Sequence, residues 1–207
     1  MVSEPEDLRS HAGVLKVDLT VHNYTTPEGS TRYCYIDANG SQSPTLRVNP
    51  GDLVILNLKN DLVDLHADGA AANHAHMHAA PGNTDLPCTS GLMTPTSTNL
   101  HFHGLTIPPT CHQDEVLNTS IQPGDPPFEY RFRIPADEPP GLYWYHPHIH
   151  GFAKVPVLGG ASGAMIVEGI ERTNKALAGL PERVLIIRDQ DLLNPNAPPS
   201  KSEPVLP

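Results

Sequence analysis

Charge is scarce in this sequence, and positive charge is scarcest. Only 17% of its 207 residues are charged, and 13 Lys and Arg oppose 23 Asp and Glu, so the formal net charge is −10. Because a nucleic-acid-binding domain needs a basic face, we do not expect nucleic acid as a partner. Apolar runs are short: none approaches the roughly 20 residues that cross a bilayer, so we expect no membrane span. The first residues also lack the basic and apolar regions of a signal peptide.

Cysteine is scarce as well, with only Cys34, Cys88 and Cys111 present. No C-x-x-C pair occurs, which excludes a zinc ribbon and a thioredoxin-like redox site. Cys88 and Cys111 lie in Pro-rich stretches on either side of a histidine motif. Two interpretations stay open: a disulfide between them in an oxidising compartment, or three unrelated buried thiols.

Proline, in contrast, is abundant, with 23 residues, and that density argues against long helices. Short β-rich or alternating segments recur between turn signals, and one short helix is expected at residues 173–178. The nine candidate strands are residues 15–21, 33–36, 45–48, 53–58, 99–103, 128–134, 141–146, 164–167 and 183–187. This pattern predicts an all-β fold, an antiparallel sandwich or barrel, with a long His-, Ala- and Gly-rich loop at residues 66–95.

The 12 histidines are the excess to be explained, and several form tight sets. One H-x-H motif holds His101 and His103, and one H-x-H-x-H motif holds His146, His148 and His150. On a strand, residues i and i+2 face the same way, roughly 6.6 Å apart. Neutral imidazole suits Cu, Zn, Ni and Fe, so two such strands side by side predict a metal centre, with a solvated histidine surface as the alternative.

A third H-x-H-x-H set, with a methionine inside it, lies in the long loop. Its members are His74, His76 and His78, and Met77 stands between the last two. Met and His both bind copper, so the set is either a flexible copper-scavenging loop or an incidental solvated tract. The isolated histidines are expected to be structural or at the surface. They are His11, His22, His66 and His112.

The two paired motifs resemble those of the multicopper oxidases, the laccase-like family. Asn-Leu-His-Phe-His-Gly at residues 99–104 resembles the first copper motif, and residues 139–148 resemble the second. Residues 45–52 and 159–167 are similar to flanking strands of the family, so the resemblance covers roughly residues 13–190. It implies a cupredoxin-like Greek-key β-sandwich that supplies half the ligands of a trinuclear copper cluster.

The resemblance also assigns roles. It implies that His101 binds the type 2 copper and that His103, His146 and His148 bind the type 3 pair, whereas His150 lies beyond the two-His pattern as a further metal-site or pocket residue. A carboxylate often follows the first motif by about a dozen residues and relays protons to reduced oxygen. Asp114 fits that position best and Glu115 is next to it, although the two could also be a surface acidic pair.

The family pattern is incomplete here, because no H-C-H motif is present for a type 1 copper. We therefore expect residues 1–12 to be an extension, residues 13–190 a cupredoxin domain, and residues 191–207 a Pro-rich linker toward missing C-terminal domains. The full enzyme would couple one-electron oxidation of phenols or metal ions to reduction of O2 to water, in the periplasm or outside the cell. The chain alone would then be inactive.

Three alternatives to this interpretation stay open. The chain could be a stand-alone copper-binding or carrier protein. It could be a homo-oligomer in which facing copies complete the cluster between subunits. It could also be a structural β-sandwich whose histidine sets are vestigial.

Overall fold

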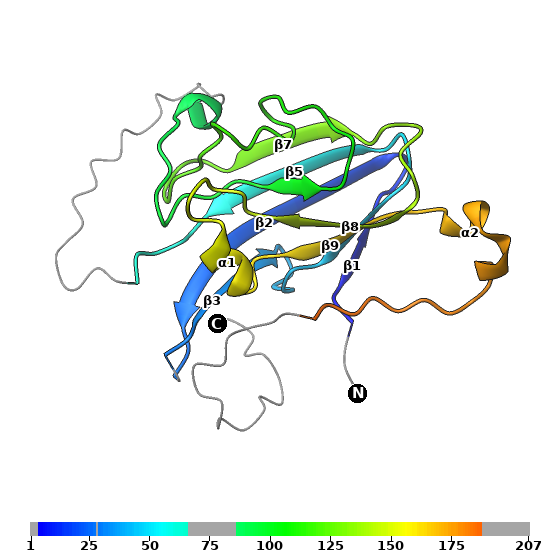
Figure 1. Ribbon diagram of the computed structural model, residues 1–207, viewed down its shortest axis with the longest axis horizontal. Coiled ribbons are helices and arrows are strands. Elements are labelled where there is room, and N and C mark those ends of the chain that lie inside the picture. Colours follow the sequence, from blue (N-terminus) through cyan, green and yellow to red (C-terminus); the bar gives the residue numbers. More distant parts are fainter. Residues whose placement is uncertain (1–3, 28, 66–85, 188–207) are drawn as a thin grey trace.

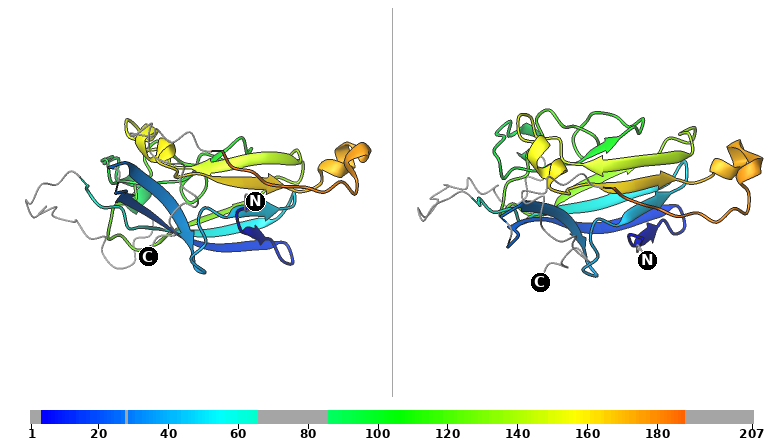
Figure 2. Two further views of the ribbon diagram at one scale, coloured as in Figure 1. Left: turned by 90° about the horizontal axis from the view of Figure 1, so that it is seen from below. Right: turned by 60° about the horizontal axis from the view of Figure 1, so that its bottom comes forward.

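Two stacked β-sheets make up the molecule (Figures 1 and 2). The structure is a computed structural model that describes residues 4–27, 29–65 and 86–187. The five-stranded sheet has the order β1 (Asp7–Arg9), β4 (Thr45–Val48), β9 (Gly163–Val167), β8 (Gly141–His146) and β6 (His101–His103). The four-stranded sheet has the order β3 (Thr31–Asp37), β2 (Val14–Thr25), β5 (Leu53–Asn60) and β7 (Phe128–Arg133). The predicted all-β sandwich is confirmed.

The core lies between the two sheets and follows from the alternation of apolar residues. In β2 as far as Val21, and throughout β7, every second side chain is buried, as expected for strands with one face in the core. From the other sheet, Phe102 of β6 points inward and packs on Tyr130 and Phe132 of β7, with ring centroids 5.7 and 4.6 Å apart. Because Phe102 faces inward, its neighbours in β6 must face outward.

The strand pairing is mixed, which the prediction of an antiparallel arrangement missed. β2 pairs antiparallel with β3 but parallel with β5, and β4 pairs parallel with both β1 and β9. The cause is the path of the chain: after the β2–β3 hairpin it crosses to the other sheet for β4, and it returns to run beside β2 in the same direction. β8 is antiparallel to both of its neighbours, β9 and β6.

Residues 183–187, predicted as a strand, pair with none of the described strands. The carboxylate of Glu4 accepts hydrogen bonds from the Arg183 Nε and the Val184 backbone N–H, at 3.1 and 2.9 Å. The neighbouring Glu182 is paired with Arg47, a buried guanidinium that also binds Asp7 at 2.7 Å. This apolar segment is therefore held by hydrogen bonds and ion pairs of charged side chains, and not by backbone pairing with a strand.

The helices are short, as the proline content predicts. α1 (Lys154–Leu158) was not expected, and it carries Pro156 in its first turn, where a missing backbone N–H costs little. The expected helix at residues 173–178 is replaced by α2 (Ile170–Thr173) and the 3-10 turn η2 (Lys175–Leu177). Another 3-10 turn, η1 (Leu86–Thr89), precedes β6. Among the described residues, no helix is long and apolar enough to cross a membrane.

A disulfide links Cys88 of η1 to Cys111, with their Cα atoms 5.6 Å apart. This decides between the two interpretations of the cysteines. Cys34 is a buried free thiol in β3. The loop closed by the disulfide contains the whole of β6, so it restrains the strand that carries the first histidine motif. The His74, His76 and His78 set lies outside the described residues.

Candidate metal centre

Strands β6 and β8 bring the two histidine motifs together at the edge of the five-stranded sheet. In their antiparallel register, His101 lies opposite His146 and His103 lies opposite Trp144. Phe102 faces the core, so the imidazoles on either side of it point to the outer face of the sheet. The sequence spacing of two residues thus becomes a shared face.

Four imidazoles gather there. The ring of His101 has its centroid 5.2 Å from that of His103, 5.3 Å from that of His146 and 5.4 Å from that of His148. Nitrogen atoms of His101, His103 and His146 all lie within 4.8 Å of one another. The His103 Nδ1 and the His146 Nε2 are 3.3 Å apart. That spacing fits a shared ion, because two nitrogens about 2.0 Å from one tetrahedral ion are themselves about 3.3 Å apart.

Hydrogen bonds set which nitrogen of each ring is free to bind a metal. The Nδ1–H of His146 donates to the Pro147 carbonyl at 2.9 Å, which leaves the Nε2 lone pair free. The Nδ1 of His101 lies 2.9 and 3.0 Å from the two carboxylate oxygens of Asp114, so this nitrogen carries the hydrogen. A carboxylate that holds one imidazole nitrogen orients the other toward a metal and makes it more basic.

His146 is held in its neutral, metal-binding form. Burial lowers the pKa of His146 to about 4, and the nearby rings of His101, His103 and His148 act in the same direction against the Pro147 carbonyl. Metal binding requires an unprotonated imidazole, so at neutral pH this ring has no proton to release. The donor set, its spacing and the neutral state of His146 all fit a metal such as copper.

The two predicted carboxylates have different positions. Asp114 contacts His101 and also accepts the backbone N–H of Phe102 at 2.9 Å. Glu115 turns toward its own loop and accepts hydrogen bonds from the backbone N–H groups of residues 117–119. Burial acts to raise the pKa of Glu115, but the hydrogen bonds from Thr119, Asn118 and Leu117 together hold it below its usual value. Of these two carboxylates, Asp114 is the one that contacts a cluster histidine.

The second motif ends in two exposed histidines. The His148 ring faces His101, and its backbone N–H donates to the Asn99 side chain at 2.7 Å. The His150 backbone N–H meets the sulfur of Met93 at 3.1 Å. In the described part of the chain, the ring contacts of the cluster do not include His150. A metal-binding role of His150 stays a prediction.

Two residues besides the predicted ones, Asn99 and Trp144, also contact the cluster histidines. Trp144 stacks on His146 with centroids 3.9 Å apart and on His103 at 5.0 Å, so it covers one side of the cluster. Its position two residues before His146, on the same face of β8, was the available signal. Asn99 stands two residues before His101 and is fully buried. Of the isolated histidines, His112 stacks on Phe128 at 4.7 Å, a structural contact.

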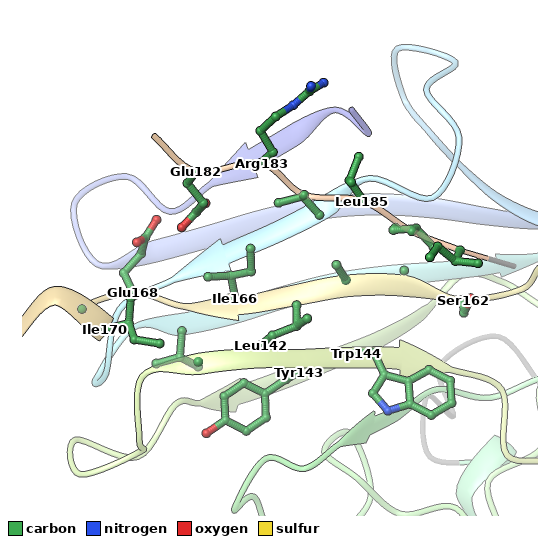
Figure 3. A pocket seen from close by; sticks show the side chains of 18 of the residues that line it. Leu142, Tyr143, Trp144, Ser162, Ile166, Glu168, Ile170, Glu182, Arg183 and Leu185 are labelled. Carbon is green, nitrogen blue, oxygen red and sulfur yellow. The ribbon is translucent and has the colours of Figure 1, made fainter. Parts of the chain in front are cut away.

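Trp144 also borders a cavity of about 780 Å³ on the outer face of β8 and β9, beneath residues 182–187 (Figure 3). Its lining is mainly apolar, with Leu142, Ile166 and Leu185 on its walls. Glu168 and Glu182 stand at one end, beside Arg47. The histidine cluster and this cavity are therefore neighbours on one face of the sheet.

Comparison with known proteins shows which family this chain is similar to. The family model described as multicopper oxidase matches residues 91–172, the stretch that holds both histidine motifs. Over this stretch the chain is similar to the multicopper oxidases. It is 31% identical over 129 residues to the iron transport multicopper oxidase fetC of Epichloe festucae, a match covering 60% of this chain and 15% of that protein. It is 25% identical over 126 residues to Laccase-2 of Thanatephorus cucumeris, covering 59% of this chain and 16% of that protein.

Solved multicopper oxidases share the fold. A McoA variant from Aquifex aeolicus superimposes with a TM-score of 0.56 at 19% identity, over 84% of this chain and 30% of that one. The Campylobacter jejuni metallo-oxidase gives a TM-score of 0.53 at 22% identity, over 81% of this chain and 29% of that one. The chain thus spans about a third or less of the length of these multicopper oxidases. Copper is the cofactor that the family implies.

Proposed function

We propose that residues 13–190 form the copper-binding first domain of a laccase-like multicopper oxidase, which couples one-electron oxidation of phenols or metal ions to reduction of O2 to water. The observation that carries this proposal is the convergence of four imidazoles from two H-x-H motifs on one sheet face. When bound, copper supplies the one-electron redox chemistry that a four-electron reduction of O2 requires.

The residues of this chain would hold and prepare that site. We assign His101 to a type 2 copper and His103, His146 and His148 to a type 3 pair, as half of the ligand set. Asp114 holds the Nδ1–H of His101 and so directs the Nε2 outward. As the carboxylate nearest to the cluster, Asp114 would also take up and deliver protons there.

The other half of the ligands would come from outside this sequence, since it contains no H-C-H motif. The face that carries the cluster is open to a partner: His103 and His148 are exposed, and β6 is an edge strand. We therefore propose that a further cupredoxin domain of the same protein covers this face, and that the 207-residue chain alone does not turn over a reducing substrate. The Cys88–Cys111 disulfide favours an oxidising compartment, so the periplasm or the extracellular space.

The test is a titration of the purified chain with Cu(II), followed by calorimetry and electron paramagnetic resonance. Wild type is compared with His101→Ala and His146→Ala, and with His11→Ala as the matched control, because His11 is an exposed histidine outside the cluster. We expect the cluster variants to weaken binding by more than about 100-fold, beyond the loss seen when only a partner of a ligand is removed. Equal binding by all four proteins would refute the proposal.

The same exposed edge also supports a second candidate, a homo-oligomer that completes the cluster between subunits. Mass in solution, measured with and without copper, separates the two candidates. A copper-dependent oligomer that consumes O2 with a phenol would favour the oligomer. A monomer that binds copper tightly without O2 uptake would favour the single domain or a copper carrier.

A further inference from the structure

Asn99 is a fully buried amide that connects the two histidine motifs. It stands two residues before His101, at the start of the first motif. Its Oδ1 accepts the backbone N–H of His148, in the second motif, at 2.7 Å. Its Nδ2 donates to the carbonyl of Thr119 at 3.0 Å and to that of Val116 at 3.4 Å. Every polar contact of this side chain is therefore to main chain.

The orientation of the amide admits one solution. A backbone N–H needs an acceptor and the two carbonyls need donors, so exchanging the oxygen and nitrogen of the amide would break all three bonds. A buried amide with both donors and its acceptor in use does not rotate without leaving polar groups unpaired. Asn99 is thus fixed by three hydrogen bonds, and one of them holds the backbone N–H of His148.

The two hydrogen bonds that the Asn99 Nδ2 donates connect it, through a loop, to the first histidine motif. The loop of residues 114–119 begins with Asp114, which contacts the His101 ring, and it ends with Thr119, which accepts from Asn99. Glu115 stiffens this loop by accepting hydrogen bonds from three of its backbone N–H groups. The chain of contacts therefore closes on itself: from His101 through Asp114 and the loop to Asn99, and from Asn99 to His148.

We propose that Asn99 is a positioning residue for the metal centre, which holds the main chain of His148 against the loop of residues 114–119 and thereby sets where the His148 imidazole stands relative to His101. This rests on the proposed function, because it concerns the same centre. His148 is exposed and lies beyond the end of β8, so no sheet ladder holds it. Asn99 supplies the restraint that the strand does not.

The chain offers a matched control in Asn60, the last residue of β5. Asn60 is 1% exposed, donates from Nδ2 to the carbonyls of Thr96 and Ile121 at 2.9 and 2.8 Å, and accepts the Leu62 N–H at 2.9 Å. It makes the same three kinds of hydrogen bond as Asn99 but contacts no histidine of the cluster. Asn99→Leu and Asn60→Leu therefore remove equivalent bonds at similar volume.

The experiment compares Cu(II) affinity and thermal unfolding of the 207-residue chain in both variants. We expect similar losses of stability, but a weakening of Cu(II) binding of about 10- to 100-fold in Asn99→Leu alone, the usual effect of losing a group that orients a ligand. Equal affinities in the two variants would overturn the proposal. If wild type itself binds no copper more tightly than His101→Ala and His146→Ala do, the proposed function fails, and this inference fails with it.

Two further measurements separate positioning from general destabilisation. In a double-mutant cycle, Asn99→Leu should weaken copper binding by less than about twofold once His148→Ala is present, because its route to the metal is already gone. An undiminished effect would contradict a role through His148. Amide hydrogen exchange of wild type, which needs no variant to fold, should show a slowed His148 N–H. Exchange as fast as in an unfolded chain would refute the restraint.

Discussion

Acidification of the metal-free protein tests the electrostatics of the cluster directly. Burial and three neighbouring imidazoles lower the pKa of His146 from 6.5 to about 4, so the folded chain resists a proton that the unfolded chain accepts. As pH falls below 6.5, protons bind preferentially to the unfolded state and stability declines. The contribution of His146 is thus fully present above pH 6.5 and is lost between pH 6.5 and about 4.

The size of this loss follows from the two pKa values. At pH 5 the unfolded imidazole is almost entirely protonated and the folded one is still mostly neutral, which costs about 2 kcal/mol relative to pH 7.5. Over the whole transition the cost reaches about 3 kcal/mol. Carboxylates with lowered pKa values, such as Glu115, lose their stabilising effect only as pH falls below about 4.5, so they fall outside most of this window.

The assay is urea unfolding of the chain at pH 7.5 and at pH 5.0, in buffer that contains a chelator to keep the protein free of metal. Wild type is compared with His146→Gln, which keeps a polar side chain at this position but cannot titrate. The fall in unfolding free energy between the two pH values should be about 2 kcal/mol smaller in the variant than in wild type. Equal falls would show that His146 titrates normally and would refute the burial argument.

Three further predictions concern the supports of the centre. Replacing both Cys88 and Cys111 by Ser should reduce the unfolding free energy by about 3 kcal/mol, as expected for a cross-link between residues 23 apart in sequence, and urea unfolding measures it. Tyr130→Phe removes the acceptor of the buried Leu100 N–H, at 2.8 Å, so we expect a loss of about 1–3 kcal/mol, and unchanged thermal unfolding would contradict this. Asp114→Asn keeps the shape but removes the charge that orients the His101 ring, and should weaken Cu(II) binding by about 10- to 100-fold in a calorimetric titration.

Most strands could be predicted because their signal is local. Alternation of apolar and polar residues in the sequence predicted β2 and β7. The spacing of two residues predicted that His101 and His103 share one face of a strand. Residues 183–187 show the limit of that signal. They have β-forming side chains, but pairing depends on a free neighbouring strand, and here Glu4 binds the segment instead.

The site divides in the same way. The motifs predicted the histidines and favoured Asp114 over Glu115, but the contacts of the two carboxylates come from the fold: Asp114 reaches His101, whereas Glu115 accepts hydrogen bonds from its own loop. The sequence does not show which of Asn99 and Asn60 contacts the histidine cluster. Only one of them meets a cluster histidine, because the fold brings the His148 main chain to it.

The sequence by itself determined the residue types of the centre, the strand periodicity that aligns them, and the family that its motifs resemble. All three depend on the local order of residues along the chain. The tertiary structure decided which groups meet. The register of β6 against β8 sets His101 opposite His146, and the packing of the loops selects Asp114 and Asn99 as their supports. Such contacts join residues 13 to 49 positions apart, and no local pattern encodes them.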